Sequence, residues 1–199
     1  MAVTDVMEYN RSTMTVREFY GPYFDRLKKA QQRVLAFSHR LMKFYEAQGG
    51  TYRIVSVHSR IKTPESMLEK LRLRGLPETR EAALFTLTDA VGVRIVCLRE
   101  EDVYAVAEAA REYARFLVVE EEDYIRTPKE SGYRSYHMLI QMASEVQEGI
   151  EDPITVELQI RTVEIDEAAR KAHDTDYKQK TPDRESPLWK GWEPYDGEK

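Results

Sequence analysis

Residues 154–161 alternate strictly between apolar and polar side chains. The apolar members are Ile154, Val156, Leu158 and Ile160, and the polar members are Thr155, Glu157, Gln159 and Arg161. Successive side chains of a β-strand point to opposite faces, so this pattern predicts a strand with one buried and one polar face. An ordinary solvent-exposed sheet face would give the same pattern, so these polar residues do not by themselves establish a site.

Four further strand-like runs precede this one, at 52–57, 91–98, 115–120 and 135–141. Helical periodicity is found at 15–48, 64–74, 79–87, 100–114 and 163–178, and Gly21-Pro22 is expected to kink or split the first of these. Strands interleaved with helices indicate an α/β or α+β sheet. We therefore expect an N-terminal helical segment (1–49), a five-stranded sheet domain (50–180) and an irregular, proline-containing tail (181–199).

Composition narrows the class of protein. The chain of 199 residues is 42% apolar, which suits one domain with a substantial core. The lone Cys97 is interpreted as a small buried hydrophobe, and the lack of a disulfide framework suits a cytoplasmic location. No signal peptide and no membrane-spanning run is seen. The net charge of −5 argues against a protein coated in nucleic acid, although it leaves room for a local basic pocket.

Other predicted strands also carry polar side chains on one face. Ser135, His137 and Gln141 share a face of the fourth strand. His58, Arg60 and Lys62 share a face of the first strand and its extension, and Asp89 and Arg94 bracket the entry to the second strand. Several strands thus bring acids, bases and amides to one side of the sheet, which favours a functional site.

The helix predicted at 64–74 is a candidate anion-binding element. Thr63 can cap it, Pro64 fits its first turn, and Ser66, Lys70 and Arg74 fall on one face. Residues 53–80 hold seven Lys/Arg and three Glu, against the net negative charge of the chain. Fixed cations beside a helix N-terminus suit a polyphosphate. The alternative is a surface helix with ordinary charge.

Asp89 and Glu157 are the acids expected on the polar side of the sheet. Mg²⁺ is commonly held by one or two carboxylates together with phosphates, so the pair predicts a magnesium–nucleotide site, with structural ion pairs as the alternative. Gly132 permits a turn before the fourth strand, so that Tyr133 can either stack on a base or pack structurally.

Four segments together resemble the synthetase domain of the RelA/SpoT family, and in size its stand-alone small alarmone synthetases. They are His58–Ser66 with Lys70 and Arg74, Asp89–Ile95, Lys129–His137 and Glu157–Thr162. They occur in the family's order and cover about residues 50–180. The resemblance implies a mixed sheet related to nucleotidyltransferase folds, and transfer of pyrophosphate from ATP to the 3′ hydroxyl of GDP or GTP.

The resemblance also implies roles for individual residues. Arg60 and Arg94 would sandwich the ATP adenine, and Lys62, Ser66, Lys70 and Arg74 would bind its phosphates. Asp89 would hold Mg²⁺, and Glu157 would activate the 3′ hydroxyl and approach the metal. Tyr133 would stack on the acceptor guanine beside Lys129 and His137, with Gln159 and Arg161 supporting the site.

Departures from the family pattern leave other functions open. In the last helix Ala172 and Asp176 replace the usual Glu and Asn, while His173, Tyr177 and Lys178 match. A tRNA 3′ end or an adenosine nucleotide therefore remains an alternative acceptor, as does an antitoxin partner. A catalytically inactive nucleotide-binding module is a further alternative. We expect no hydrolase activity and, because residues 181–199 differ from the C-terminal helices of tetrameric relatives, no closed tetramer.

Overall fold

The computed structural model describes residues 14–50, 52–148, 152–180 and 192–195, and its centre is one six-stranded sheet. The strands are β1 (Ile54–Ile61), β2 (Val91–Cys97), β3 (Phe116–Asp123), β4 (Tyr136–Met142), β5 (Thr155–Thr162) and β6 (Glu193–Pro194). Their order is β3-β4-β5-β2-β1-β6. Among the described strands, β2 and β5 form the only parallel pair, and the other neighbours are antiparallel. The expected mixed α+β architecture is confirmed, with six strands in place of five.

Three strands differ from the sequence-based expectation, and one of them, β3, continues through Asp123. β1 continues through Ile61 because its polar residues pair with β2 along the whole length, from Ile54 opposite Cys97 to Ile61 opposite Val91. β6 lies in the tail predicted to be irregular, of which residues 181–191 and 196–199 fall outside the described part. Pro194 argued against a strand there because proline lacks an N–H, but an edge position tolerates it.

The helices follow the predicted periodicity, including the expected break at Gly21, with two differences. They are α1 (Val16–Tyr20), α2 (Phe24–Ala47), α3 (Pro64–Leu73), α4 (Glu100–Glu112), α5 (Ala143–Gln147) and α6 (Val163–Lys180). The 3₁₀ turn η1 (Gly21–Tyr23) splits the first predicted helix at Gly21, whose φ is 51°. The helix predicted at 79–87 is a single π-helical turn, η2 (Ala82–Thr86), and the short α5 was not predicted.

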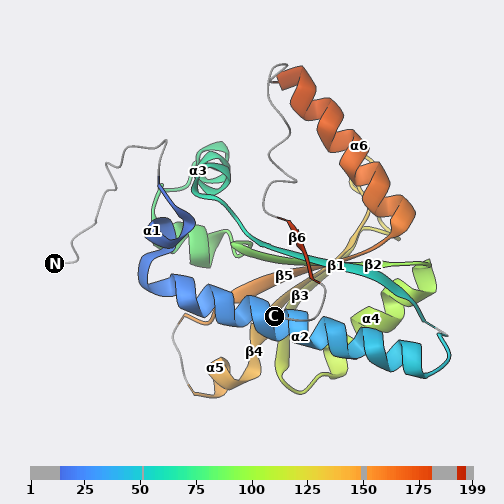
Figure 1. The fold of residues 1–199 in the computed structure, drawn as a ribbon. Helices are drawn as coiled ribbons and strands as arrows, with labels where there is room; N and C mark the ends of the chain where they lie inside the picture. Colours follow the sequence, from blue (N-terminus) through green and yellow to red (C-terminus); the bar gives the residue numbers. More distant parts are fainter. Residues whose placement is uncertain (1–13, 51, 149–151, 181–191, 196–199) are drawn as a thin grey trace.

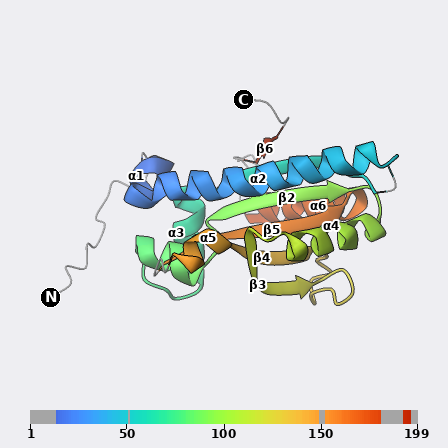
Figure 2. The ribbon, with the colours of Figure 1, turned by 90° about the horizontal axis from the view of Figure 1, so that it is seen from below.

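Helices cover the apolar face of the sheet and leave the polar face on the other side. α2 packs along β1 and β2, and α4 packs on β5 and its neighbours, on the same side of the sheet. Fully buried residues of this layer include Val34, Val106, Ile95 and Leu158. α3 and α6 lie on the opposite side (Figures 1 and 2). The even-numbered residues of β2 and the odd-numbered residues of β5 therefore face the side of α3 and α6.

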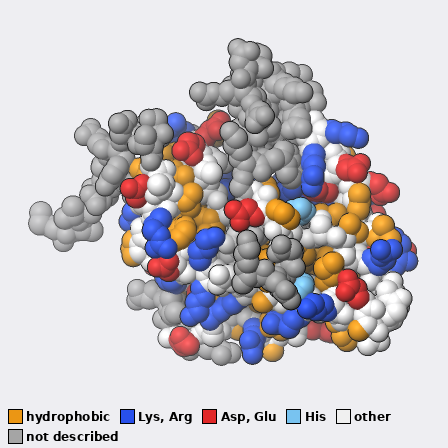
Figure 3. Space-filling view, viewed as in Figure 1, with side chains coloured by type: hydrophobic (Ala, Val, Ile, Leu, Met, Phe, Trp, Pro, Cys, Tyr) orange, Lys and Arg blue, Asp and Glu red, His pale blue; other side chains and the backbone are white. Residues whose placement is uncertain are grey.

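Charge is unevenly distributed over the surface. α2 carries six Lys/Arg and two acidic residues, and Figure 3 shows Lys and Arg side chains gathered along it. Its exposed cations include Lys28, Lys29, Arg40 and Lys43. None of the helices in the described part of the chain has the length and apolar character needed to cross a bilayer.

Candidate active site

Two neighbouring cross-strand rows hold five of the predicted site residues, including Glu157. One row consists of His58, Arg94, Gln159 and His137, on β1, β2, β5 and β4. The next row consists of Arg60, Gly92, Glu157 and Leu139. Side chains of aligned residues on one face lie within contact distance. Pairing of four strands therefore brings together residues that are up to about a hundred positions apart in the sequence.

Glu157 lies in the middle of these rows and is held by two donors. His137 Nδ1 is 3.3 Å from one carboxylate oxygen, and Gln159 Nε2 donates to the other at 2.9 Å. Burial alone would raise the pKa of Glu157, but the hydrogen bond and charge of His137, the charge of Lys62 and the Gln159 hydrogen bond together lower it to about 2. Glu157 is therefore a carboxylate at neutral pH.

The hydrogen bonds around Glu157 continue through His137 to Tyr133 and Arg161. Arg161 Nη2 donates to the Tyr133 hydroxyl at 2.7 Å, and that hydroxyl lies 2.8 Å from His137 Nε2. The Tyr133 hydroxyl therefore lies between Arg161 and His137, while His137 Nδ1 faces the Glu157 carboxylate. These contacts link Arg161, Tyr133, His137 and Glu157 in that order.

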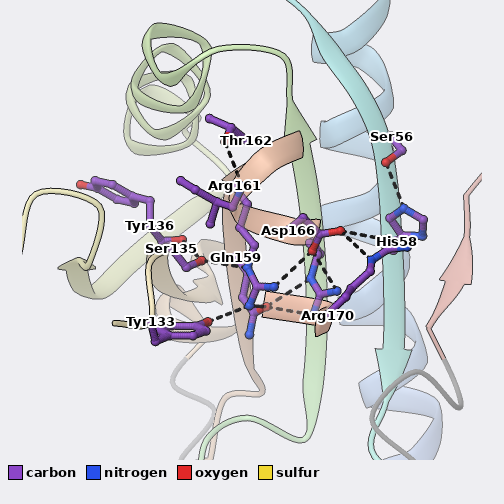
Figure 4. A network of polar contacts seen from close by, with 12 residues as sticks. Ser56, His58, Tyr133, Ser135, Tyr136, Gln159, Arg161, Thr162, Asp166 and Arg170 are labelled. Carbon is purple, nitrogen blue, oxygen red and sulfur yellow. Dashed lines mark hydrogen bonds and ion pairs between the residues drawn. The ribbon is translucent and has the colours of Figure 1, made fainter. Parts of the chain in front are cut away.

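Asp166, in the first turn of α6, anchors the arginines of the polar face (Figure 4). Its carboxylate lies 3.3 Å from Arg94 Nη1, 3.2 Å from Arg161 Nη1 and 2.8 Å from Arg170 Nη2. Arg94 also donates to Gln159 Oε1 at 3.3 Å. Sequence reasoning gave Asp166 no role, because an acid in the first turn of a helix is explained by the helix dipole alone.

Burial affects the pKa values of this arginine group. Burial and the positive charge of Arg161 lower the pKa of Arg94, while Asp166 raises it. His58, beside Arg94 in the cross-strand row, also has a lowered pKa, through burial and then the charges of Arg170 and Arg94. Guanidinium groups stay charged in proteins, so the polar face remains strongly cationic here.

A second cluster forms where β1 ends and β2 begins. Lys62 and Lys70 both contact Oδ2 of Asp89, and the backbone N–H of Lys62 donates to Ala90 O at 2.9 Å. Thr88, just before Asp89, has a φ of 57°, a left-handed conformation that is uncommon for a β-branched residue. Such a backbone conformation persists only where the surrounding structure holds the residue in place. Here it occurs directly before Asp89, whose carboxylate contacts the two lysines.

Helix α3 begins next to this cluster and contributes Lys70 to it. The Thr63 hydroxyl accepts from the Ser66 N–H at 3.4 Å, and Pro64 occupies the first turn, as predicted. Lys70, one helical turn after Ser66, contacts Asp89. Ser66 is half-buried, and Arg74, the C-cap residue, is exposed. The structure thus joins Lys62, Lys70 and Asp89, and places Ser66 and Arg74 on the same helix.

Lys129 belongs to the turn that precedes β4. Gly132 adopts a φ of 79°, and its N–H donates to Lys129 O at 2.7 Å. The Lys129 ammonium lies 4.1 Å from the ring centre of Tyr124 and 5.7 Å from that of Tyr133. Tyr133 is half-buried, with its hydroxyl held by Arg161 and His137, so the sequence-based placement of its ring on the polar side is confirmed.

The carboxylates fit a magnesium ion that is shared with a phosphate ligand. Oδ1 of Asp89 is buried and has no hydrogen-bond partner among the described residues, so one carboxylate oxygen is available to a cation. In the same part of the chain, no group of three or more His, Cys, Asp or Glu could hold a metal. The donor set therefore suits Mg²⁺, which accepts one or two carboxylates and takes its remaining ligands from phosphates and water.

Carboxylates among lysines and arginines on one face of a mixed sheet define a site suited to a metal-bound polyphosphate. The chain matches the family model described as a region found in RelA / SpoT proteins over residues 59–182, and it belongs to that family. The resemblance inferred from the four sequence segments is thereby confirmed.

Individual relatives agree with this assignment. Over 134 residues the chain is 34% identical to GTP pyrophosphokinase YwaC and 36% identical to GTP pyrophosphokinase YjbM, both of Bacillus subtilis (strain 168). Each match covers 67% of this chain but 63% and 62% of the relatives, so it spans less than two thirds of their length. The crystal structure of small alarmone synthetase 1 from Bacillus subtilis, bound to its product pppGpp, is similar with a TM-score of 0.67 and 29% identity, covering 83% of this chain and 82% of that one.

Proposed function

We propose that this protein transfers pyrophosphate from ATP to the 3′ hydroxyl of GDP or GTP, giving AMP and the alarmones ppGpp or pppGpp. The observation that carries the proposal is the ionised Glu157, fixed by His137 and Gln159 on the same sheet face as the Asp89–lysine cluster. The names of the relatives and the product in the similar crystal structure support it. A cytoplasmic location follows from the use of these nucleotides.

The donor nucleotide is assigned to β1, β2 and α3. Arg60 and Arg94 would flank the adenine, because Arg60 lies opposite Gly92 on the adjacent strand and Arg94 lies two residues further along β2 on the same face. Four residues would bind the phosphates: Lys62, Ser66, Lys70 and Arg74. Lys62 and Lys70, which now contact Asp89, are placed to exchange that contact for phosphate oxygens.

The acceptor nucleotide is assigned to β4, β5 and the turn before β4. Tyr133 would stack on guanine, and Lys129 and His137 would approach the acceptor phosphates. Gln159 and Arg161 would act through others: Gln159 positions Glu157, and Arg161 positions Tyr133.

Chemically, the acceptor O3′ forms a bond to the β-phosphorus of ATP while the bond from that phosphorus to the oxygen bridging to the α-phosphate breaks, releasing AMP. The proton of O3′ passes to Glu157. A carboxylate with a pKa of about 2 accepts that proton only as the oxygen bonds to phosphorus, so proton transfer and attack are expected to be concerted. Mg²⁺, held by Asp89 with Glu157, would neutralise the polyphosphate charge.

A direct assay tests the proposal. The protein is incubated with Mg²⁺ and ATP labelled in its β- and γ-phosphates, and separately with GDP, GTP, unlabelled ATP or bulk tRNA as acceptor. We expect the label to appear on GDP or GTP. Label on tRNA or on an adenosine nucleotide would show that the acceptor assignment is wrong, and no transfer to any acceptor would favour the inactive binding module.

One observation favours a nucleic-acid partner, namely the basic surface of α2. Non-specific contact with a phosphate backbone needs a basic surface of this kind. However, α2 covers the apolar side of the sheet, opposite the side to which Tyr133 and Glu157 are assigned. The guanosine acceptor is therefore the preferred proposal, and the tRNA arm of the assay decides between them.

A further inference from the structure

Trp192, just before β6, lies between the two arginines assigned to the adenine. The centre of the Arg60 guanidinium is 4.7 Å from the Trp192 ring centre, and that of Arg94 is 4.1 Å away. Both distances are within the range of a cation–π interaction. An indole and an adenine are both planar bicyclic rings of similar size, so the two cannot occupy this position together.

The sheet beneath the indole provides space for a flat ring. A Cβ added to Gly92 would lie 3.2 Å from Cη2 of Trp192 and 3.6 Å from Cζ2. The ring thus rests against the bare backbone of β2 at Gly92, which lies opposite Arg60 and two residues before Arg94. A site of this form accepts a planar ring in general, which is what adenine binding also requires.

Within the part of the chain that the structure describes, few contacts hold the segment that carries Trp192. β6 pairs with β1 through two residues, Glu193 opposite Ser59 and Pro194 opposite His58. The Tyr195 N–H donates to Val57 O at 2.9 Å, and the Tyr195 ring meets His39 of α2 edge-on at 5.8 Å. Short edge pairing of this kind opens at low free-energy cost, so β6 can leave without unfolding the sheet.

The hydrogen bonding of the Trp192 indole is also incomplete in this position. Its Nε1 is buried and has no hydrogen-bond partner among the described residues. A buried tryptophan N–H usually finds a hydrogen-bond partner, and leaving it without one destabilises the docked position of the ring. This cost lowers the stability of the docked segment relative to a bound nucleotide.

From these contacts we propose that Trp192 is an intramolecular competitor of ATP: the β6 segment docks on β1, places the indole in the adenine position, and must be displaced before ATP binds. The inference rests on the proposed function, because it uses the assignment of Arg60 and Arg94 to adenine. If the segment is docked in about 90–99% of molecules, apparent ATP affinity falls roughly ten- to a hundredfold.

Binding measurements on full-length variants test the competition. A non-hydrolysable ATP analogue is titrated calorimetrically into wild type, Trp192→Ala and Tyr195→Pro, with Tyr195→Phe as the matched control. Tyr195→Pro removes the N–H that pairs with Val57 but keeps Trp192, whereas Tyr195→Phe keeps that N–H. We expect roughly tenfold tighter binding in Trp192→Ala and Tyr195→Pro, and wild-type affinity in Tyr195→Phe.

Fluorescence reports the position of the indole independently. The chain has two tryptophans, so a Trp189→Phe background leaves Trp192 as the sole reporter. We expect acrylamide to quench it weakly without nucleotide, and more strongly in Tyr195→Pro or when the ATP analogue is added.

The outcomes separate this inference from the proposed function. Equal or weaker binding in Trp192→Ala would overturn the inference, because the indole would then be neutral or part of the nucleotide pocket. Unchanged quenching of Trp192 by acrylamide on saturation with the analogue would overturn it as well. No ATP binding in any variant would instead show that the ATP assignment of the proposed function is wrong, and the inference would fall with it.

Discussion

Replacing Glu157 with Gln removes one negative charge while keeping the size of the side chain. We expect Glu157→Gln to lower the single-turnover rate of pyrophosphate transfer by about 10²–10⁴-fold, the usual range for a general base, with ATP affinity nearly unchanged. Glu120→Gln, an exposed glutamate of β3, is the matched control and should keep the wild-type rate. Retention of more than about a tenth of the rate in Glu157→Gln would show that this carboxylate is not the base.

The two roles proposed for Tyr133 can be distinguished by separate substitutions. Tyr133→Ala removes the ring and should raise the acceptor KM roughly ten- to a hundredfold, because a base–aromatic stack is worth ~1–3 kcal/mol. Tyr133→Phe keeps the ring but removes the hydroxyl between Arg161 and His137, so we expect a near-normal KM and a kcat lowered several-fold.

The measurements for Tyr133 are acceptor KM, kcat, ATP affinity and melting temperature on both variants. A purely structural tyrosine would predict a lower melting temperature and similar losses for both nucleotides. If Tyr133→Phe raised KM as much as Tyr133→Ala, the hydroxyl and not the stack would account for acceptor binding.

At the scale of single residues, strand alternation was enough to place Glu157, Gln159 and His137 on one polar face. Asp166 and Trp192 could not be found in this way. Their importance depends on what the chain brings beside them: three arginines around Asp166 and two around Trp192. A local pattern contains no information on such partners, and a tryptophan in a proline-containing tail gives no periodic signal.

Helix α3 offers a test with two cations on different faces. Lys70 contacts Asp89, whereas Arg72 pairs with Glu78 at 2.8 Å on an exposed face. We expect Lys70→Ala to weaken ATP binding roughly tenfold or more, as for loss of a charged hydrogen bond, and to affect acceptor binding less. Arg74→Ala should act in the same direction. Arg72→Ala should leave both affinities near wild type, and separate titrations of the two nucleotides check this.

An equal loss of ATP and acceptor affinity in Lys70→Ala would contradict the assignment of α3 to the donor nucleotide. An effect of Arg72→Ala as large as that of Lys70→Ala would show that the charge of the helix as a whole, and not its Asp89-facing side, determines binding.

Elements with a strong local signal were predicted well, whereas the end of β1 and the whole of β6, which depend on pairing with a neighbouring strand, were not. The Thr63–Pro64 start of α3 and the break at Gly21 follow from local chemistry. β1 extends through Ser59 and Arg60, and β6 exists at all, because each pairs with a neighbouring backbone. Backbone pairing depends on the order of the strands in the sheet, and a short stretch of sequence does not determine that order.

The same limit applies to the whole molecule. The parallel pairing of β2 with β5 sets Arg94 beside Gln159 and Gly92 beside Glu157, although these segments are separated by two strands and two helices in the sequence. Sequence patterns identified the polar faces, and the family resemblance implied that they converge. The register that joins them is a property of the folded sheet.

The ionised Glu157 predicts how the stability of the whole protein depends on pH. Its pKa is about 2 in the folded protein against an ordinary value of 4.5, so between these values the unfolded chain binds more protons. Stability therefore rises with pH through this window: the contribution is fully present above about pH 4.5 and is lost as pH falls toward 2. We expect the urea midpoint of wild type to fall more steeply from pH 6 to pH 3 than that of Glu157→Gln, which lacks the titrating group. The other carboxylates titrate in both proteins, so the difference between the two curves isolates Glu157. Parallel curves over this range would show that the His137–Glu157–Gln159 contacts do not stabilise the carboxylate in solution.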